Sequence, residues 1–146
     1  MQMTLSVNLR ALLATSLGLF IMEAAGADFE RPAQPSMVFV TQTGCHFCDR
    51  LDEAVISPLE AYGLFDETVR LVRLSIDPGS RVTDVDGQNV AAVDFAARYG
   101  AYGTPTLLFL DAQGQAHSEA LYGVPDAIDF YGAKIEAAVG RLAQSQ

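Results

Sequence analysis

The feature that most constrains the fold is the cysteine pair in Thr43-Gly44-Cys45-His46-Phe47-Cys48. An apolar run, Met37 to Thr41, precedes this stretch and predicts a buried strand, because branched and aromatic residues without charges suit a strand covered on both faces. Residues 49–56 have the apolar spacing of an amphipathic helix. Cys45 is therefore expected where a strand ends and a helix begins.

A cysteine at a helix start has a chemical consequence. The first backbone N–H groups of a helix lack partners within the helix, and the helix dipole favours an anion there. The Cys45 thiol should therefore lose its proton more readily than a free thiol, and the thiolate is the reactive form. The sequence predicts a redox-active Cys45–Cys48 dithiol that needs no metal, flavin or nucleotide cofactor.

Two other roles for the cysteine pair fit the sequence less well. A purely structural disulfide would close a loop with only two residues inside it, and stabilisation by a disulfide grows with loop length. A structural zinc site needs four ligands. His46 lies within the pair, but the only other histidine, His117, is expected on a hairpin strand.

Composition limits the classes of function. The chain has 146 residues, half of them hydrophobic, which fits one domain with a substantial core. Its formal net charge of −9 argues against binding to nucleic acid, whose phosphates require a basic surface. The same charge argues against docking on an anionic membrane surface.

The first 27 residues differ from the rest of the chain. Arg10 precedes an apolar run from Ala11 to Met22, and Ala25-Gly26-Ala27 places small residues where a signal peptidase cleaves. We expect residues 1–27 to be a secretory signal peptide, with an uncleaved N-terminal membrane anchor as the alternative. Export would place the protein in an oxidising compartment, a bacterial periplasm, where a dithiol needs a dedicated redox partner.

The remaining chain predicts alternating strands and helices. Residues 28–36 are expected to form an extended lead-in, 37–143 the folded domain, and 144–146 a tail. The expected strands are 37–42, 69–76, 106–110 and 115–121, and the expected helices are 45–56, 58–62, 90–99 and 126–142. Ser57 and Asn89 are expected helix caps, with Val90, Val93 and Ala97 pointing inward. Residues 81–88 fit either a small hairpin or a loop. This order predicts an α/β sandwich with a mixed sheet.

The predicted domain resembles the thioredoxin superfamily in several matched segments. They are Cys45-His46-Phe47-Cys48, Leu74-Ser75-Ile76-Asp77, Phe95 to Gly100 followed by Gly103-Thr104-Pro105-Thr106-Leu107, and Asp111-Ala112-Gln113-Gly114-Gln115. The resemblance implies a three-layer sandwich with helices on both faces of the sheet. It is similar in particular to small periplasmic thioredoxin-like thiol-disulfide oxidoreductases, including those of sulfur-oxidation gene clusters. It therefore implies a monomer that reduces protein disulfides and is recharged by a membrane electron carrier.

The resemblance also implies roles for single residues. Cys45 would be the attacking cysteine and Cys48 the resolving one. Pro105 would follow a cis peptide bond, with Thr104 beside the sulfurs, and both would form the groove for an extended substrate.

Three further residues are expected to modulate the dithiol. A His46 imidazolium beside Cys45 would favour the thiolate, and Phe47 is expected to contact the substrate. Arg73 stands where thioredoxins have a lysine near the dithiol. Solvated side chains are the alternative for His46 and Arg73, and an exposed rim position is the alternative for Phe47.

Two departures from cytosolic thioredoxins bear on function. Phe39 stands where those proteins bury an aspartate, and the chain has no tryptophan. General disulfide reduction of the cytosolic kind is therefore not expected. A disulfide oxidase or isomerase remains an alternative, as does a redox-inert module that binds partners on the same scaffold.

Overall fold

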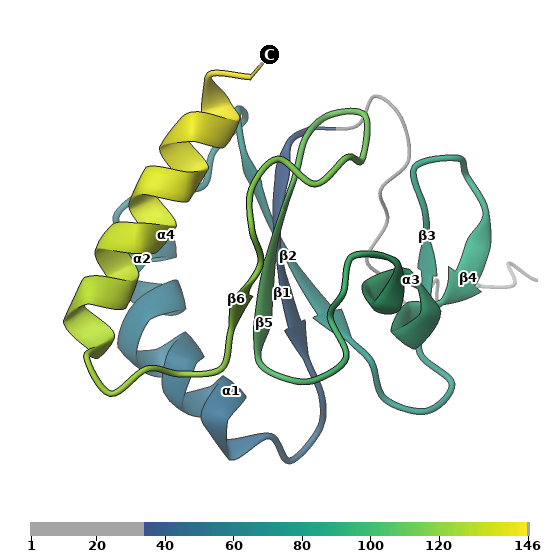
Figure 1. Cartoon of the computed structure of the whole chain (residues 1–146), viewed down its shortest axis with the longest axis horizontal. Coiled ribbons are helices and arrows are strands. Elements are labelled where there is room, and N and C mark those ends of the chain that lie inside the picture. Colours follow the sequence, from purple (N-terminus) through teal and green to yellow (C-terminus); the bar gives the residue numbers. More distant parts are fainter. Residues whose placement is uncertain (1–33, 146) are drawn as a thin grey trace, which may run out of the picture.

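The computed structural model describes residues 34–145, which contain a four-stranded mixed sheet (Figure 1). Its strands are β1 (Ser36–Thr41), β2 (Arg70–Ser75), β5 (Thr106–Leu110) and β6 (Leu121–Tyr122). The strand order is β2-β1-β5-β6, with β2 parallel to β1, β5 antiparallel to β1, and β6 antiparallel to β5. The predicted signal peptide and most of the predicted lead-in lie outside the described residues.

The central strand β1 is buried on both faces, which explains its unbroken apolar sequence. Met37 and Phe39 pack on one face with the core that includes Ile135. Val38 packs on the opposite face, in the core that includes Phe95. Full burial of one such side chain contributes about 1.5–3 kcal/mol. The paired cores therefore fix β1, and with it the point where the chain leaves the sheet toward Cys45.

The helix after the cysteines is continuous, whereas the sequence predicted a break at Ser57. It comprises α1 (His46–Leu51), a π-helical segment η1 (Asp52–Ile56) and α2 (Ser57–Ala61). Ser57 has helical dihedral angles, and its N–H donates to the carbonyl of Asp52. Pro58 lacks an N–H and would clash with a carbonyl four residues earlier in a regular α-helix. The wider π-helical segment accommodates the proline without ending the helix.

Residues 81–91 form a hairpin of β3 (Arg81–Thr83) and β4 (Asn89–Ala91). The predicted cap at Asn89 is wrong, because Asn89 pairs with Thr83 in this hairpin and its side chain accepts a hydrogen bond from Arg81. Helix α3 (Ala92–Arg98) begins two residues later than predicted, and a different face of it is buried. Ala92, Phe95 and Ala96 are buried, whereas Val93 is 50% exposed.

The C-terminal part follows the prediction in β5 and in the last helix, and departs from it in between. The strand expected at 115–121 is reduced to β6 and a single bridge between Leu110 and Ala116. The Asp111 carboxylate accepts the N–H groups of Gln113 and Gln115, which favours a turn over a paired strand. Helix α4 (Ile128–Ala143) has six apolar residues at helical spacing, and it buries five of them, whereas the first, Ile128, is partly buried. The buried residues are Tyr131, Ile135, Ala138, Val139 and Leu142.

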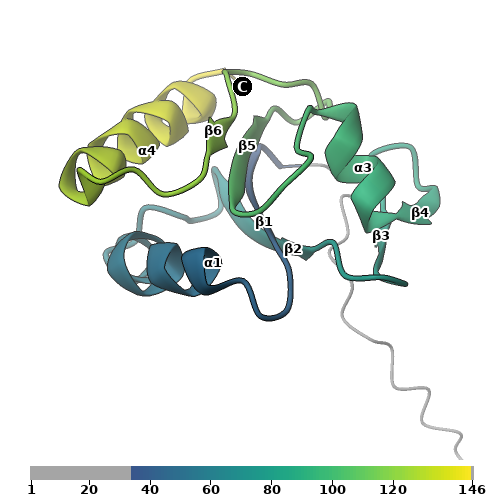
Figure 2. The ribbon, with the colours of Figure 1, turned by 60° about the horizontal axis from the view of Figure 1, so that its bottom comes forward.

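The layers confirm the predicted fold class, an α/β sandwich with helices on both faces of the sheet. Helices α1, α2 and α4 lie on one face, and α3 with the β3–β4 hairpin lies on the other (Figures 1 and 2). No helix within residues 34–145 is long and apolar enough to cross a membrane.

Candidate active site

Cys45 and Cys48 form a disulfide at the start of α1, with an S–S distance of 2.08 Å. Cys45 is the N-cap of this helix, and its sulfur accepts the N–H of Cys48 at 3.2 Å. Cys48 is only 2% exposed and belongs to the core between the sheet and α4, whereas Cys45 is partly exposed. The two sulfurs therefore differ in access, and only Cys45 is open to a large partner.

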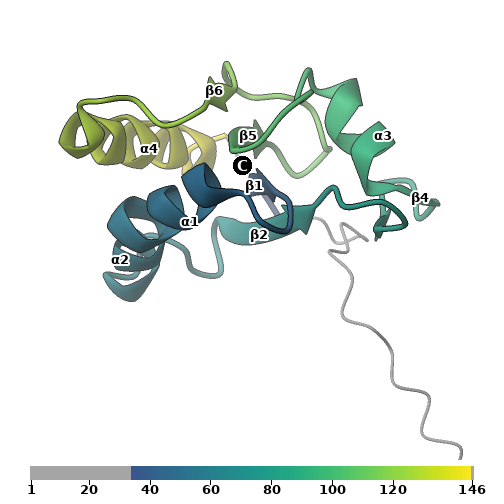
Figure 3. The same cartoon turned by 90° about the horizontal axis from the view of Figure 1, so that it is seen from below.

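The loop before β5 contacts Cys45, the partly exposed cysteine. The Thr104–Pro105 peptide bond is cis, and the Thr104 hydroxyl lies 3.4 Å from the Cys45 sulfur, although the two residues are 59 positions apart. Figure 3 shows the start of α1 beside the entry into β5. The Pro105 carbonyl accepts the N–H of Gly123 at 2.9 Å, which ties this loop to the end of β6. The structure thus brings Cys45, Thr104 and Pro105 together, as the resemblance implies.

A further contact ties this loop to the core. The Tyr131 hydroxyl in α4 donates to the Gly123 carbonyl at 3.2 Å, and burial raises the pKa of Tyr131 to about 12. Tyr131 is therefore neutral over the pH range in which thiol exchange operates. A chain of contacts runs from Pro105 through Gly123 to α4.

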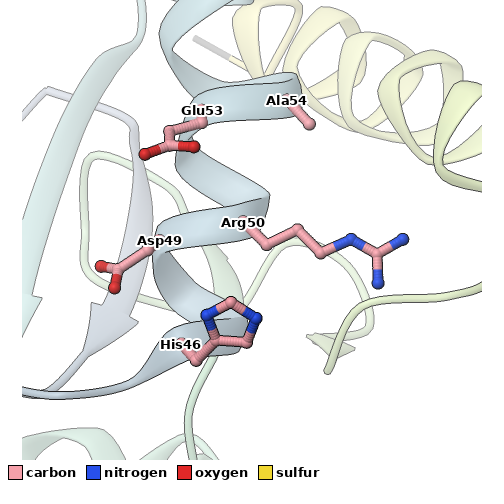
Figure 4. A pocket seen from close by; sticks show the side chains of 5 residues that line it. All are labelled: His46, Asp49, Arg50, Glu53 and Ala54. Carbon is pink, nitrogen blue, oxygen red and sulfur yellow. The ribbon is translucent and has the colours of Figure 1, made fainter.

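His46 and Phe47 lie between the cysteines and face solvent. Phe47 is 58% exposed, and its ring centroid is 6.1 Å from that of His46. His46 lines an open pocket on the outer face of the helix (Figure 4), where the other lining residues are Asp49, Arg50, Glu53 and Ala54. This surface beside the dithiol is accessible and carries charges of both signs.

Arg73, in β2, is held by two carboxylates of the neighbouring helical segments. Its guanidinium pairs with Asp52 at 3.0 Å and with Glu60 at 2.9 Å. The hydrogen bond to Glu60 is the largest cause of its raised pKa. The structure thus joins Arg73 to η1 through Asp52 and to α2 through Glu60. Phe39, which pairs with Arg73 across β1 and β2, is buried in the same core as Cys48.

One polar contact at this site was missed by sequence reasoning. Asp77, which follows β2, accepts hydrogen bonds from both the backbone and the side chain of Thr43, two residues before Cys45. The sequence placed Asp77 only at the end of a strand and in a turn. Its contact with Thr43 spans 34 residues, and nothing in the local pattern of either segment indicates it.

The mixed sheet, the Cys-x-x-Cys pair at a helix start and the adjoining cis-proline loop together define a protein of thioredoxin fold. Residues 22–133 match the family model described as a thioredoxin-like domain, and the chain belongs to this family. No curated protein gives a significant match.

Solved structures with low sequence identity share the fold. A thioredoxin-fold protein from Helicobacter pylori is 14% identical with a TM-score of 0.53, covering 81% of this chain and 84% of that one. The DsbD C-terminal domain from Neisseria meningitidis, in its oxidised form, is 17% identical with a TM-score of 0.50, covering 74% and 83%. StoA from Bacillus subtilis is 12% identical with a TM-score of 0.50, covering 72% and 81%.

Proposed function

We propose that this protein is an exported thiol-disulfide oxidoreductase that reduces disulfides of protein substrates in the periplasm. The observation that carries the proposal is the asymmetry of the cysteine pair. Cys45 is partly exposed beside Thr104, and Cys48 is 2% exposed behind it. An exchange reaction needs one sulfur that meets the partner and a second that is shielded from it.

The reaction proceeds through a mixed disulfide. The Cys45 thiolate attacks one sulfur of the substrate disulfide, which breaks the substrate S–S bond and releases one substrate thiolate. The Cys48 thiolate then attacks the Cys45 sulfur, re-forms the Cys45–Cys48 bond and releases the second substrate thiolate. Two electrons pass from the dithiol to the substrate, and the released thiolates take up protons. The electrons are carried by the cysteines themselves, so no other cofactor takes part.

Neighbouring groups support the first step. The N–H of Cys48 already donates to the Cys45 sulfur, at 3.2 Å, and the same bond would stabilise a thiolate. The Thr104 hydroxyl at 3.4 Å is a second donor. Thr104 and Pro105 would present their loop to an extended segment of the substrate, and Phe47 would add an apolar contact.

The direction of transfer and the partners rest on the resemblance to small periplasmic oxidoreductases. The protein would act as a monomer and would be returned to the dithiol form by a membrane electron carrier. The signal peptide expected at residues 1–27 would direct export, and an N-terminal anchor would leave the same domain facing the periplasm.

The decisive experiment measures the reduction potential of the Cys45–Cys48 pair together with reduction of insulin disulfides. A potential near about −270 mV with insulin reduction supports the reductase, whereas one near about −120 mV indicates an oxidase. A Cys45→Ser variant serves as the control and should be inactive. A purified, reduced domain with no measurable potential and no insulin reduction would favour a redox-inert module that binds partners through the Thr104–Pro105 groove.

A further inference from the structure

The carboxylate of Asp77 is the side-chain connection between the loop before Cys45 and the neighbouring strand. It accepts the backbone N–H of Thr43 at 3.0 Å and the Thr43 hydroxyl at 2.7 Å. It also accepts the hydroxyl of Ser75 at 2.7 Å, which holds the carboxylate against the end of β2. Three donors therefore converge on one acidic group, and two of them belong to a residue 34 positions away.

The loop that Asp77 holds has few other restraints. The backbone pairing between β1 and β2 ends with the N–H of Ile76 donating to Thr41 at 2.9 Å. After that point the turn is closed by one long bond, from the N–H of Cys45 to the Gln42 carbonyl at 3.3 Å. Gly44 has a φ of +74°, a conformation that glycine adopts without strain. The Cys45 carbonyl is held from the helix by the N–H groups of Cys48 and Asp49, so the contacts made by Thr43 fix Cys45 from the side of the turn.

We propose that Asp77 is a positioning residue for the exchange reaction, which fixes Thr43 so that the Cys45 sulfur stays at the helix N-terminus in the dithiol form. This inference rests on the proposed function. In the disulfide form the bond to Cys48 also holds the Cys45 sulfur, but that restraint is lost on reduction. The hydrogen bonds between Asp77 and Thr43 involve neither cysteine, so reduction of the disulfide breaks none of them directly.

The ionised carboxylate suits this role over the working pH range. The hydrogen bond from the Thr43 side chain is the largest cause that holds the pKa of Asp77 below its usual value of 3.8, with further contributions from Ser75 and from the Thr43 backbone. The acceptor therefore stays charged wherever thiols exchange, and bonds to a charged acceptor are stronger than neutral ones.

A positioning role and a direct electrostatic role predict opposite effects on the thiol. If Asp77 positions Cys45, its removal displaces the sulfur from the helix N–H groups, and the pKa of the Cys45 thiol rises. If Asp77 acts only through its negative charge, its removal relieves repulsion of the thiolate, and the pKa of the thiol falls. A purely structural role changes the stability of the fold and leaves the thiol pKa unchanged.

The test measures alkylation of Cys45 by iodoacetamide against pH in the reduced protein, with the modified cysteine identified by mass spectrometry. Asp77→Ala should raise the thiol pKa by about half to one unit, which at a pH below the wild-type pKa slows alkylation roughly three- to tenfold. Thr43→Val, which loses the hydroxyl and keeps the N–H, should shift the pKa in the same direction by less. Thr43→Ser should restore the wild-type value.

Asp66→Ala is the matched control. Like Asp77, Asp66 is an aspartate whose carboxylate accepts backbone N–H groups, those of Thr68 at 2.7 Å and Val69 at 3.3 Å, but it precedes β2 instead of following it. Its removal should leave the thiol pKa at the wild-type value. Circular dichroism of each variant establishes that the fold is retained.

An unchanged or lowered thiol pKa in folded Asp77→Ala overturns the proposal, and so does an equal shift in Asp66→Ala. If Asp77→Ala does not fold, Thr43→Val decides by the same criteria. The outcome is separable from the proposed function, because alkylation needs no disulfide substrate. A wild-type protein that reduces no disulfides would refute the proposed function, whatever Asp77 does to the thiol.

Discussion

An aspartate lies at each end of strand β2. Both accept hydrogen bonds from backbone N–H groups, but the donors lie at very different distances along the sequence. Asp66, before the strand, accepts N–H groups from residues two and three positions further along the chain. Asp77, after the strand, binds Thr43, which is 34 positions away and next to the cysteine pair. The end of the sheet that holds Asp66 also contains Asp111, whose carboxylate accepts the N–H groups of Gln113 and Gln115 in its own turn.

This difference separates carboxylates that bind within their own turn from a site that several segments build together. At the Asp66 end, the carboxylates of Asp66 and Asp111 bind donors of their own turns, so their removal should act on local stability. At the Cys45 end, the cysteine turn, the end of β2 and the Thr104–Pro105 loop meet. A change there should act on reactivity even where the fold is retained.

The largest effect should come from exchanging the cysteines one at a time. Cys48→Ser should leave Cys45 able to attack but unable to release its partner, so a mixed disulfide should accumulate in the periplasm. Cys45→Ser should trap little, because Cys48 is 2% exposed. Non-reducing gels and mass spectrometry of the captured species measure both. Equal capture by the two variants would mean that the roles of the cysteines are reversed.

A change at the Asp66 end of the sheet should reduce the stability of the fold and leave the reactivity of the thiols unchanged. A Cβ at Gly114 would lie 2.5 Å from Val85 Cγ1, and Gly114 has a φ of +76°. Gly114→Ala should therefore lower the free energy of unfolding by about 1–3 kcal/mol. Its matched control is Gly87→Ala, which has a φ of +77° and open space around the added Cβ.

Urea unfolding of Gly114→Ala and Gly87→Ala separates the clash with Val85 from backbone strain. Gly114→Ala should be the less stable of the two, and both should keep the wild-type alkylation rate of Cys45. A slowed alkylation in Gly114→Ala would show that the two ends of the sheet are coupled.

Exposed aromatic residues offer a third contrast. Phe47, 58% exposed, lies between the cysteines, whereas Tyr62, 90% exposed, follows α2. Phe47→Ser should lower kcat/KM for a protein disulfide about three- to tenfold, the effect of losing roughly 1 kcal/mol of contact with the substrate. Tyr62→Ser should leave kcat/KM unchanged. Equal losses in the two variants would remove Phe47 from the proposed contact surface.

The smallest effect concerns acid stability. Hydrogen bonds hold the pKa of Asp66 and of Asp77 below the usual 3.8, for Asp66 chiefly from the Thr68 backbone and for Asp77 chiefly from the Thr43 side chain. Each carboxylate therefore contributes stability that is present above about pH 3.8 and is lost as the pH falls through the folded-state value.

Asp66→Asn and Asp77→Asn should each lower the urea midpoint near neutral pH and approach the wild type as the pH falls through the folded-state pKa of each carboxylate, which lies below 3.8. Only the change at Asp77 should also alter Cys45 alkylation. A difference from the wild type that stays constant with pH would mean that the charge of the carboxylate does not contribute.

The sequence predicted the features that depend on neighbouring residues or on the periodicity of apolar residues. The apolar run of β1, the stripe of α4 from Tyr131 to Leu142 and the place of Cys45 at a helix start all follow from periodicity or from neighbouring residues. The cis bond before Pro105 also agrees with the expectation, which came from the resemblance and not from residue spacing.

The features that the sequence did not predict depend on contacts between distant residues or on a local tendency that the surrounding structure overrides. Asn89 has a strong tendency to cap helices, but its backbone pairs with Thr83 in a hairpin that local sequence did not settle. Pro58 indicated a break, which the π-helical segment before it avoids. Arg73 was expected to modulate the dithiol or to be a solvated strand charge. Its two carboxylate partners could not be identified without the packing of the helix on the sheet.

The account depends most directly on Cys45 being the reactive cysteine, and alkylation of the reduced wild-type protein against pH tests this. With the modified residue identified by mass spectrometry, Cys45 should react first, with an apparent pKa below the free-thiol value of about 8.5. Cys48 should stay largely unmodified, because it is buried. Reaction of both thiols together, at or above that value, would contradict the account.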